Sequence, residues 1–196
     1  MPQPASDNAA WVTIETPLAA DALAAWCVDI EQLYRINPYF EFRSWRALAR
    51  DTWHVAYRNL SIGSDVEVEL RLTRGSAGAF TVSYAHGIKR LTRFTIEPVP
   101  MGSTLTIVEE YASVAREQAE READRSLHGW GMALNEYLKQ HARWRWCAPW
   151  RWYMRHVWTP MKPSARRITY IILLITCAEI ALFALAMAVW WAEQRA

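Results

Sequence analysis

The chain has 196 residues, a net charge of +2 and 52% apolar residues. Without its most apolar stretch about 165 residues remain, enough for one domain with a core and too few for two. Three widely spaced cysteines, Cys27, Cys147 and Cys177, exclude a disulfide framework and favour a reducing compartment. The first ten residues lack a basic start and an apolar centre, so we expect a flexible arm over residues 1–10, not a signal peptide.

The next hundred residues or so change from one periodicity to another. Residues 11–16 alternate apolar and polar side chains, which predicts a half-buried strand. From residue 19 to 36 apolar side chains recur at spacings of three and four, which predicts one or two short helices ending before Pro38. The period then becomes two, and short turns separate further strands, which indicates antiparallel hairpins. These strands are expected at residues 40–48, 52–60, 65–73, 79–86, 90–97 and 103–112.

A long helix is expected after the strands. Charged residues are dense over residues 116–125, and an amphipathic pattern follows. Its apolar stripe needs a partner, and the sheet is the only one available. The stripe consists of Leu127, Trp130, Gly131, Leu134, Tyr137, Leu138 and His141.

Residues 144–167 combine tryptophan with arginine and lysine, and we call this segment the collar. Tryptophan prefers the headgroup zone of a bilayer, and a cationic side chain gains about 1 kcal/mol near an anionic leaflet. The sequence therefore predicts a segment that lies flat on a membrane surface. Nucleic acid would also suit these residues, but the apolar segment that follows favours lipid. The predicted interfacial residues are Trp144, Trp146, Trp150, Arg151, Trp152, Arg155, Trp158, Arg166 and Arg167.

The most apolar stretch runs from Ile168 to Trp191 and contains one ionisable side chain, Glu179. At about 1.5 Å per residue it is long enough to cross a hydrocarbon core of about 30 Å. Lys162, Arg166 and Arg167 precede it, so the positive-inside rule predicts a single-pass protein with a cytoplasmic N-terminal domain, in the inner membrane if the cell is bacterial. We expect a domain at 11–143, then the collar, the span at 168–191 and a tail at 192–196.

Two helix faces of the span could contact a partner. A carboxylate at the middle of a bilayer is costly, so Glu179 is either protonated or directed at protein. Small residues that allow close helix approach form a separate stripe about 200° away from it. An integral membrane protein complex is therefore one expected partner. The stripe is Cys177, Ala181, Ala184 and Ala188.

A strand, two short helices, a meander of strands and a long closing helix follow one another in the chain. This order resembles the helix-grip fold of the START and polyketide-cyclase superfamily, often called SRPBCC, over residues 11–144. The segment YRINPYF at residues 34–40 is similar to the helix-to-strand passage of many members. The resemblance implies an α+β fold in which a curved antiparallel sheet of about seven strands wraps the closing helix around a cavity. Members generally bind lipids, sterols, quinones or polyketides, and some catalyse cyclisation.

Strand parity identifies the side chains that would line such a cavity. It also places His86, Thr92 and Glu109 on the inner side, beside otherwise apolar faces. The expected ligand contacts are Trp53, Tyr57, Val68, Leu70, Val82, Tyr84, Arg90, Phe94, Ile107, Tyr111, Trp130 and Leu134.

Catalysis has little support in the sequence. His86 and Glu109 could act as an acid and base if they converged. No histidine or cysteine spacing indicates a metal site, and no nucleophile turn or phosphate loop is present, so no cofactor is expected.

Three functions follow from these patterns. The first is binding or transfer of a hydrophobic small molecule at a membrane. The second is an accessory subunit that docks through its membrane helix. The third is a cyclase or aromatase acting on a lipophilic substrate. The expected partners are a hydrophobic small molecule, membrane lipids and a membrane protein complex, without nucleic acid.

Overall fold

The computed structural model describes residues 9–75, 78–112 and 123–194. The chain divides into two compact units, Met1–Pro160 and Met161–Ala196. The predicted arm falls outside the described residues up to residue 8, whereas Ala9 and Ala10 already belong to the first strand. Residues 116–122 of the charged stretch and the last two residues of the tail also lie outside the described part.

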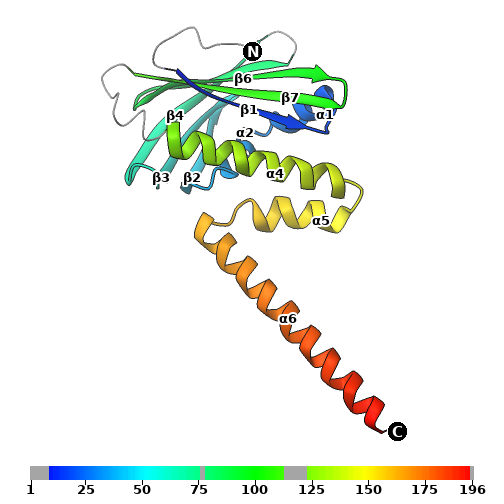
Figure 1. Ribbon diagram of the computed structural model, residues 1–196. Helices are drawn as coiled ribbons and strands as arrows, with labels where there is room; N and C mark the ends of the chain where they lie inside the picture. Colours follow the sequence, from blue (N-terminus) through cyan, green and yellow to red (C-terminus); the bar gives the residue numbers. More distant parts are fainter. Residues whose placement is uncertain (1–8, 76–77, 113–122, 195–196) are drawn as a thin grey trace. The chain divides into compact units, whose positions relative to one another are not determined.

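The first unit contains a seven-stranded antiparallel sheet in the order β1-β7-β6-β5-β4-β3-β2. Strands β2 to β7 form a meander, and β1 pairs with β7 along the far edge (Figure 1). The predicted strands and their antiparallel pairing are confirmed. Their bounds are β1 Ala9–Thr16, β2 Phe40–Ala49, β3 Thr52–Asn59, β4 Ser64–Arg74, β5 Ala79–Tyr84, β6 Lys89–Val99 and β7 Gly102–Tyr111.

Helices cover the concave side of this sheet. The long helix α4 lies under it, and α5 returns alongside α4 (Figure 1). The helices α1, α2 and α4 form where the apolar spacing of the sequence predicted them. The segment η2 begins within the charged stretch before α4, and α5 and η3 arise inside the collar. The bounds are α1 Ala20–Cys27, α2 Ile30–Arg35, η2 Ala123–Leu127, α4 His128–Trp144, α5 Ala148–Tyr153 and η3 Met154–Trp158.

The two short helices α1 and α2 are one amphipathic segment with a break. Asp29 starts α2, because its carboxylate accepts a hydrogen bond from the Gln32 backbone N–H at 3.1 Å. The inward-facing side chains of both helices, among them Leu23 and Leu33, are completely buried. The passage to β2 is tied down by Asn37, whose Nδ2 donates to the Ser126 hydroxyl at 3.1 Å. These contacts join the start of the chain to the segment that precedes α4.

Helix α4 buries the predicted stripe, including Trp130, Leu134 and Leu138, and exposes Met132 on its other face. Two glycines let it approach its neighbours closely. A Cβ at Gly131 would lie 2.5 Å from the Val12 Cγ2 of β1, and a Cβ at Gly129 would lie 2.5 Å from the Tyr39 ring. The absence of side chains at these two positions lets α4 lie close to β1 and to the segment before β2.

Two β-bulges change which side chains face inward. One extra residue in β2 between Phe42 and Ser44 allows Phe42 and Trp45, three positions apart, to share the inner face. A second shift lies between Lys89 and Leu91 of β6, where Arg90 is the extra residue. Lys89 is consequently buried and Arg90 exposed. The predicted inward position of Arg90 is therefore wrong.

The second unit is one helix, α6, from Pro163 to Glu193. It begins five residues before the predicted span, since proline is favoured in the first turn of a helix. Among the described residues it is the helix long and apolar enough to cross a membrane. Arg166 and Arg167 lie near its N-terminal end, and Glu179 lies well inside it.

The close contact at Gly131 generates a prediction. In Gly131→Ala the added methyl group meets Val12, and overpacking of this kind costs about 1–3 kcal/mol, more than the about 1 kcal/mol that alanine gains over glycine in a helix. The net loss is then up to about 2 kcal/mol, which lowers the melting temperature by up to roughly 8 °C. Thermal unfolding of the full chain in a mild non-ionic detergent, followed by near-UV circular dichroism, measures this shift.

Met132→Ala is the control, because Met132 is 63% exposed on the opposite face of the same helix. Its melting temperature should stay near that of the unaltered chain. A Gly131→Ala protein as stable as this control would contradict the packing of α4 on β1.

Candidate functional site

The middle of the inner face is an aromatic cluster built from three elements. The Tyr34 ring of α2 lies 5.1 Å from Trp130 of α4 and 6.4 Å from Phe94 of β6, measured between ring centroids. The Trp130 indole N–H donates to the Leu33 carbonyl at 3.0 Å. Trp130 thus places its polar atom on the backbone of α2 and its ring in the core.

The side chains around this cluster fill the space beneath the middle of the sheet. Among the predicted ligand contacts, a subset has an exposed fraction of 0–1%, so essentially no space the size of a water molecule adjoins them. They pack on one another, and room for a ligand must be sought toward the ends of the sheet. These residues are Val68, Leu70, Val82, Phe94, Ile107, Trp130 and Leu134.

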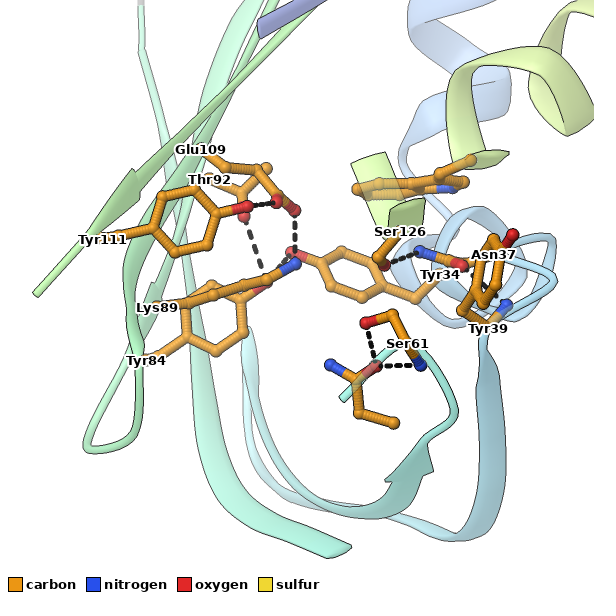
Figure 2. A network of polar contacts seen from close by, with 12 residues as sticks. Tyr34, Asn37, Tyr39, Ser61, Tyr84, Lys89, Thr92, Glu109, Tyr111 and Ser126 are labelled. Atoms are coloured by element: carbon orange, nitrogen blue, oxygen red, sulfur yellow. Dashed lines mark hydrogen bonds and ion pairs between the residues drawn. The ribbon is translucent and has the colours of Figure 1, made fainter. Parts of the chain in front are cut away.

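A buried polar network lies next to this packed centre, and Figure 2 shows its members pointing toward one another. The Lys89 ammonium donates to Glu109 Oε1 at 2.6 Å, and the Tyr111 hydroxyl donates to Glu109 Oε2 at 2.6 Å. The Lys89 and Glu109 side chains expose only 3% and 0% of their surface. Lys89 also lies 5.0 Å from the centroid of the Phe40 ring. Both carboxylate oxygens therefore have a donor, and the buried charges compensate each other.

Three further side chains extend the network. The hydroxyls of Tyr34 and Tyr84 are 2.8 Å apart, and the Tyr84 hydroxyl is 3.0 Å from that of Thr92. Burial raises the pKa of Tyr34 to about 12, although its hydrogen bond to Tyr84 acts in the opposite direction. Burial likewise raises the pKa of Tyr84 well above its usual value. Both phenols thus remain neutral at physiological pH and offer hydroxyl groups. We call Tyr34, Tyr84, Lys89, Thr92, Glu109 and Tyr111 the inner-face network.

One pocket of about 260 Å³ reaches this network from the surface. Tyr84 and Lys89 of the network form part of its wall, together with Tyr57 and apolar side chains of β4 and the loops around it. We call it the network pocket. Its lining is Tyr57, Asn59, Ile62, Ser64, Asp65, Val66, Glu67, Tyr84, His86, Gly87, Ile88 and Lys89.

A smaller pocket of about 190 Å³ lies between the α1–α2 segment and strands β4 to β6, and its lining is mostly apolar. Cys27, Ile30 and Phe80 contribute to it. Burial raises the pKa of the Cys27 thiol to about 12, so this cysteine is neutral and behaves as a small apolar side chain.

The remaining predicted inner-face residues have different positions. Trp53 is half-buried on β3, with its ring centroid 6.3 Å from that of Trp45. His86 is exposed, and its Nε2 lies 2.6 Å from the Glu67 carbonyl oxygen. Glu109 is instead held by Lys89 and Tyr111. The structure does not bring His86 and Glu109 together as the acid and base that the sequence analysis considered.

Sequence reasoning missed four residues of the inner face. Lys89 and the pair Phe42 and Trp45 escaped because strand parity is broken by bulges, which leave no simple signal in the sequence. Tyr34 was missed because it belongs to α2, to which strand parity does not apply. Within the described part of the chain, no group of three histidine, cysteine, aspartate or glutamate side chains could hold a metal ion.

The collar residues have two kinds of environment. Trp150 and Trp158 are half-buried and pack against the core, and the Trp158 ring lies 5.8 Å from that of Tyr137. Trp146 and Trp152 are 75% and 60% exposed. Trp144, Arg151 and Arg155 are also exposed, so part of the predicted interfacial set remains available to a membrane.

A curved antiparallel sheet closed by a long C-terminal helix is the helix-grip fold, the fold of the START superfamily. No protein family model matches the chain, and no curated protein matches its sequence. Solved structures match the fold. A START superfamily protein from Mycobacterium smegmatis has a TM-score of 0.56 at 16% identity, covering 67% of this chain and 97% of that one. A conserved protein from Geobacillus kaustophilus has a TM-score of 0.52 at 8% identity, covering 68% of this chain and 95% of that one.

A protein from Rhodobacter sphaeroides also matches, with a TM-score of 0.51 and 12% identity over 69% of this chain and 95% of that one. At these identities the similarity establishes the fold and leaves the function to the site. The matched chains are covered almost completely, whereas about a third of this chain lies outside the similarity.

The buried charge pair generates a second prediction. Lys89→Met leaves Glu109 as an uncompensated buried charge, which should reduce the free energy of unfolding by about 3–5 kcal/mol. Lys89→Met combined with Glu109→Gln should regain most of this loss, because the amide is neutral and still accepts from Tyr111. Chemical unfolding of the full chain in mild detergent gives the three values.

Lys139→Met removes an exposed lysine of α4 and serves as the control, with an expected change within about 0.5 kcal/mol. A single Lys89→Met variant as stable as this control would show that the Lys89–Glu109 pair contributes nothing.

Proposed function

We propose that this protein binds a hydrophobic small molecule that carries a polar oxygen group, at the surface of a membrane. The observation that carries the proposal is the network pocket, whose apolar side chains lie beside the neutral Tyr84 hydroxyl and the Lys89 ammonium, with further polar side chains at its wall. Concave, mostly apolar pockets with a few convergent polar groups are the usual sites for small ligands. The helix-grip fold, whose sheet and closing helix enclose the inner face, supports the same reading.

The chemistry of the pocket limits the ligand. Val66, Ile62 and Ile88 offer apolar contact, worth about 25 cal/mol for each Å² removed from water. A hydroxyl or carbonyl group at the inner end of the ligand could exchange hydrogen bonds with Tyr84, since a phenol is both donor and acceptor. The Tyr84 hydroxyl already contacts Tyr34 and Thr92, and it can take part in one further hydrogen bond, which a hydrocarbon cannot make. The ligand class is therefore a lipid-like alcohol, ketone or quinone rather than a pure hydrocarbon.

A membrane anchor would serve this function. Helix α6 has the length and composition of a spanning helix, and Lys162, Arg166 and Arg167 at its start favour a cytoplasmic first unit. A lipophilic ligand spends little time in water when its binding protein is tethered to the bilayer that dissolves it. In this proposal the protein takes its ligand from the adjacent membrane or delivers it there.

Narrowing the network pocket tests the proposal. Ile62→Trp enlarges a turn side chain that lines the pocket, while Leu60→Trp enlarges a nearby exposed one outside it. The full chain is purified from its native membranes in mild detergent, extracted with organic solvent and analysed by mass spectrometry. We expect a lipophilic oxygen-containing compound, enriched over its share of the membrane, that Leu60→Trp retains and Ile62→Trp loses at least tenfold.

An extract whose composition equals that of the surrounding membrane would contradict the proposal. Equal enrichment in the Ile62→Trp and Leu60→Trp proteins would also contradict it, because the ligand would then bind elsewhere.

A second function is favoured by Glu179, a carboxylate well inside the apolar helix α6. Such a group at the middle of a bilayer usually faces protein, so the chain is also proposed to be an accessory subunit of a membrane protein complex. The small residues Ala181, Ala184 and Ala188, with Cys177, form a second face on which a helix could pack closely. The two functions are compatible, because one uses the first unit and the other uses α6.

Glu179→Leu tests this second function. The full chain with an affinity tag is recovered from native membranes in mild detergent, and the co-purifying membrane proteins are quantified. A partner that contacts Glu179 should fall at least fivefold in the variant, whereas Glu193→Leu, which removes a carboxylate at the end of the same helix, should leave it unchanged. An identical set of partners in all three proteins would contradict a role for Glu179 in assembly.

A further inference from the structure

The collar folds against the rest of the first unit and forms part of another pocket. Met154 is buried with an exposed fraction of 7%, and Trp150 and Tyr153 pack against the hydrophobic core. These contacts hold α5 and η3 alongside α4 (Figure 1). Residues 148–158 of the collar are therefore a folded part of the first unit.

Between these elements lies a pocket of about 400 Å³, larger than the network pocket and within the usual range for ligand sites. Its walls come from α1, α2, α4, α5 and η3, all of which belong to the first unit. We call it the collar pocket. Aromatic rings of Trp26, Tyr137, Trp150 and Trp152 line it together with cationic and amide side chains.

The charges that line the collar pocket have one sign. These charges are the guanidinium groups of Arg151 and Arg155, and no aspartate or glutamate is among the described lining residues. The pKa of His141 is lowered by burial and also by the positive charges of Arg151 and Arg145, which reflects a cationic environment.

The neighbouring carboxylate compensates these charges only in part. Arg155 Nη2 lies 3.8 Å from Asp29 Oδ2, a long separation for an ion pair. Asp29 Oδ1 accepts from the Gln32 backbone at 3.1 Å, because this residue caps α2. Arg151 has no carboxylate partner among the described residues. Two exposed guanidinium groups thus border an aromatic pocket. Most of their N–H donors do not contact a carboxylate of the described residues.

We propose that the collar pocket binds the phosphate-bearing headgroup of an anionic phospholipid. A guanidinium group binds phosphate oxygens through paired N–H donors, so Arg151 and Arg155 would hold the phosphate. The tryptophan rings would contact the glycerol and the first carbons of the acyl chains, as this side chain does at the headgroup level of bilayers. The site is separate from the network pocket, and it depends on the proposed membrane location only for its supply of lipid.

Two features favour a lipid over free phosphate. A free phosphate ion would use the guanidinium groups and leave the aromatic walls without a partner. In the chain, only residues 159–162 separate η3 from α6, so a bilayer that holds α6 is a nearby source of headgroups. A zwitterionic headgroup fits less well, because its positive group would meet the same two arginines.

Native mass spectrometry of the full chain in a non-ionic detergent tests the inference. Dioleoyl phosphatidylglycerol and dioleoyl phosphatidylcholine are titrated separately. We expect the first bound lipid to associate at least tenfold more tightly for phosphatidylglycerol than for phosphatidylcholine. The double variant Arg151→Ala with Arg155→Ala should reduce phosphatidylglycerol binding at least tenfold, to the level of phosphatidylcholine.

Arg46→Ala with Arg50→Ala is the matched control, because it removes two exposed arginines of β2 and its following turn, away from the pocket. It should retain binding within twofold. Arg151→Lys with Arg155→Lys keeps the charge and should bind with intermediate strength, since lysine lacks the paired donors.

Three results would overturn the inference. Equal binding of the two lipids would exclude anion recognition. Equal losses in the pocket and control variants would assign binding to overall charge. Displacement of phosphatidylglycerol by equimolar inorganic phosphate would show that the site takes free phosphate. None of these results bears on the Ile62→Trp extraction, so failures of the two proposals are distinguishable.

Discussion

The insertion of Trp130 into the concave face is the contact on which the first unit depends. Its ring meets Tyr34 and Phe94, and its N–H bonds the Leu33 carbonyl, so one side chain joins α4, α2 and β6. Gly131, the next residue, permits the close approach to β1 that this insertion requires. Because α4 is held so near the sheet, the middle of the interior is closed. The network pocket accordingly lies among β3, β4 and the loops beside them, and its lining contains no residue of α4.

The charges of the protein are divided between two settings. In the interior Lys89 and Glu109 neutralise each other, and Tyr111 satisfies the second carboxylate oxygen. This arrangement avoids the cost of an unpaired buried charge and presents polar atoms to an otherwise apolar pocket. At the collar pocket, Arg151 and Arg155 border aromatic rings, and Arg155 lies 3.8 Å from the Asp29 carboxylate. The first setting suits an uncharged lipophilic molecule with one polar group, and the second suits an anion with an apolar part.

The tryptophans of the collar have two kinds of environment because the chain folds back on α4. Trp150 and Trp158 join the core and thereby fix α5 and η3, while Trp146 and Trp152 remain exposed. The composition of the collar predicts that all of it lies on a membrane surface, whereas part of it packs against the core of the first unit. The same folding creates the collar pocket, since its walls come from elements at both ends of the first unit. The shape of this pocket therefore depends on the packing of α1 and α2 as well as on that of the collar.

Periodicity located the strands and the long helices of this protein, but not α5 and η3. Alternation located the strands, the stripe containing Trp130 and Leu134 located α4, and the run of apolar residues located α6, because these patterns depend only on local geometry. Parity also placed Tyr84, Thr92 and Glu109 correctly on the inner side. Parity failed at Arg90, because this residue is the extra one in the bulge of β6. Lys89 therefore takes the inner position that parity assigned to Arg90. The pairing of Glu109 with Lys89, the closed centre and both pockets were decided by the tertiary structure, since they arise from contacts between segments far apart in the chain, which no local pattern encodes.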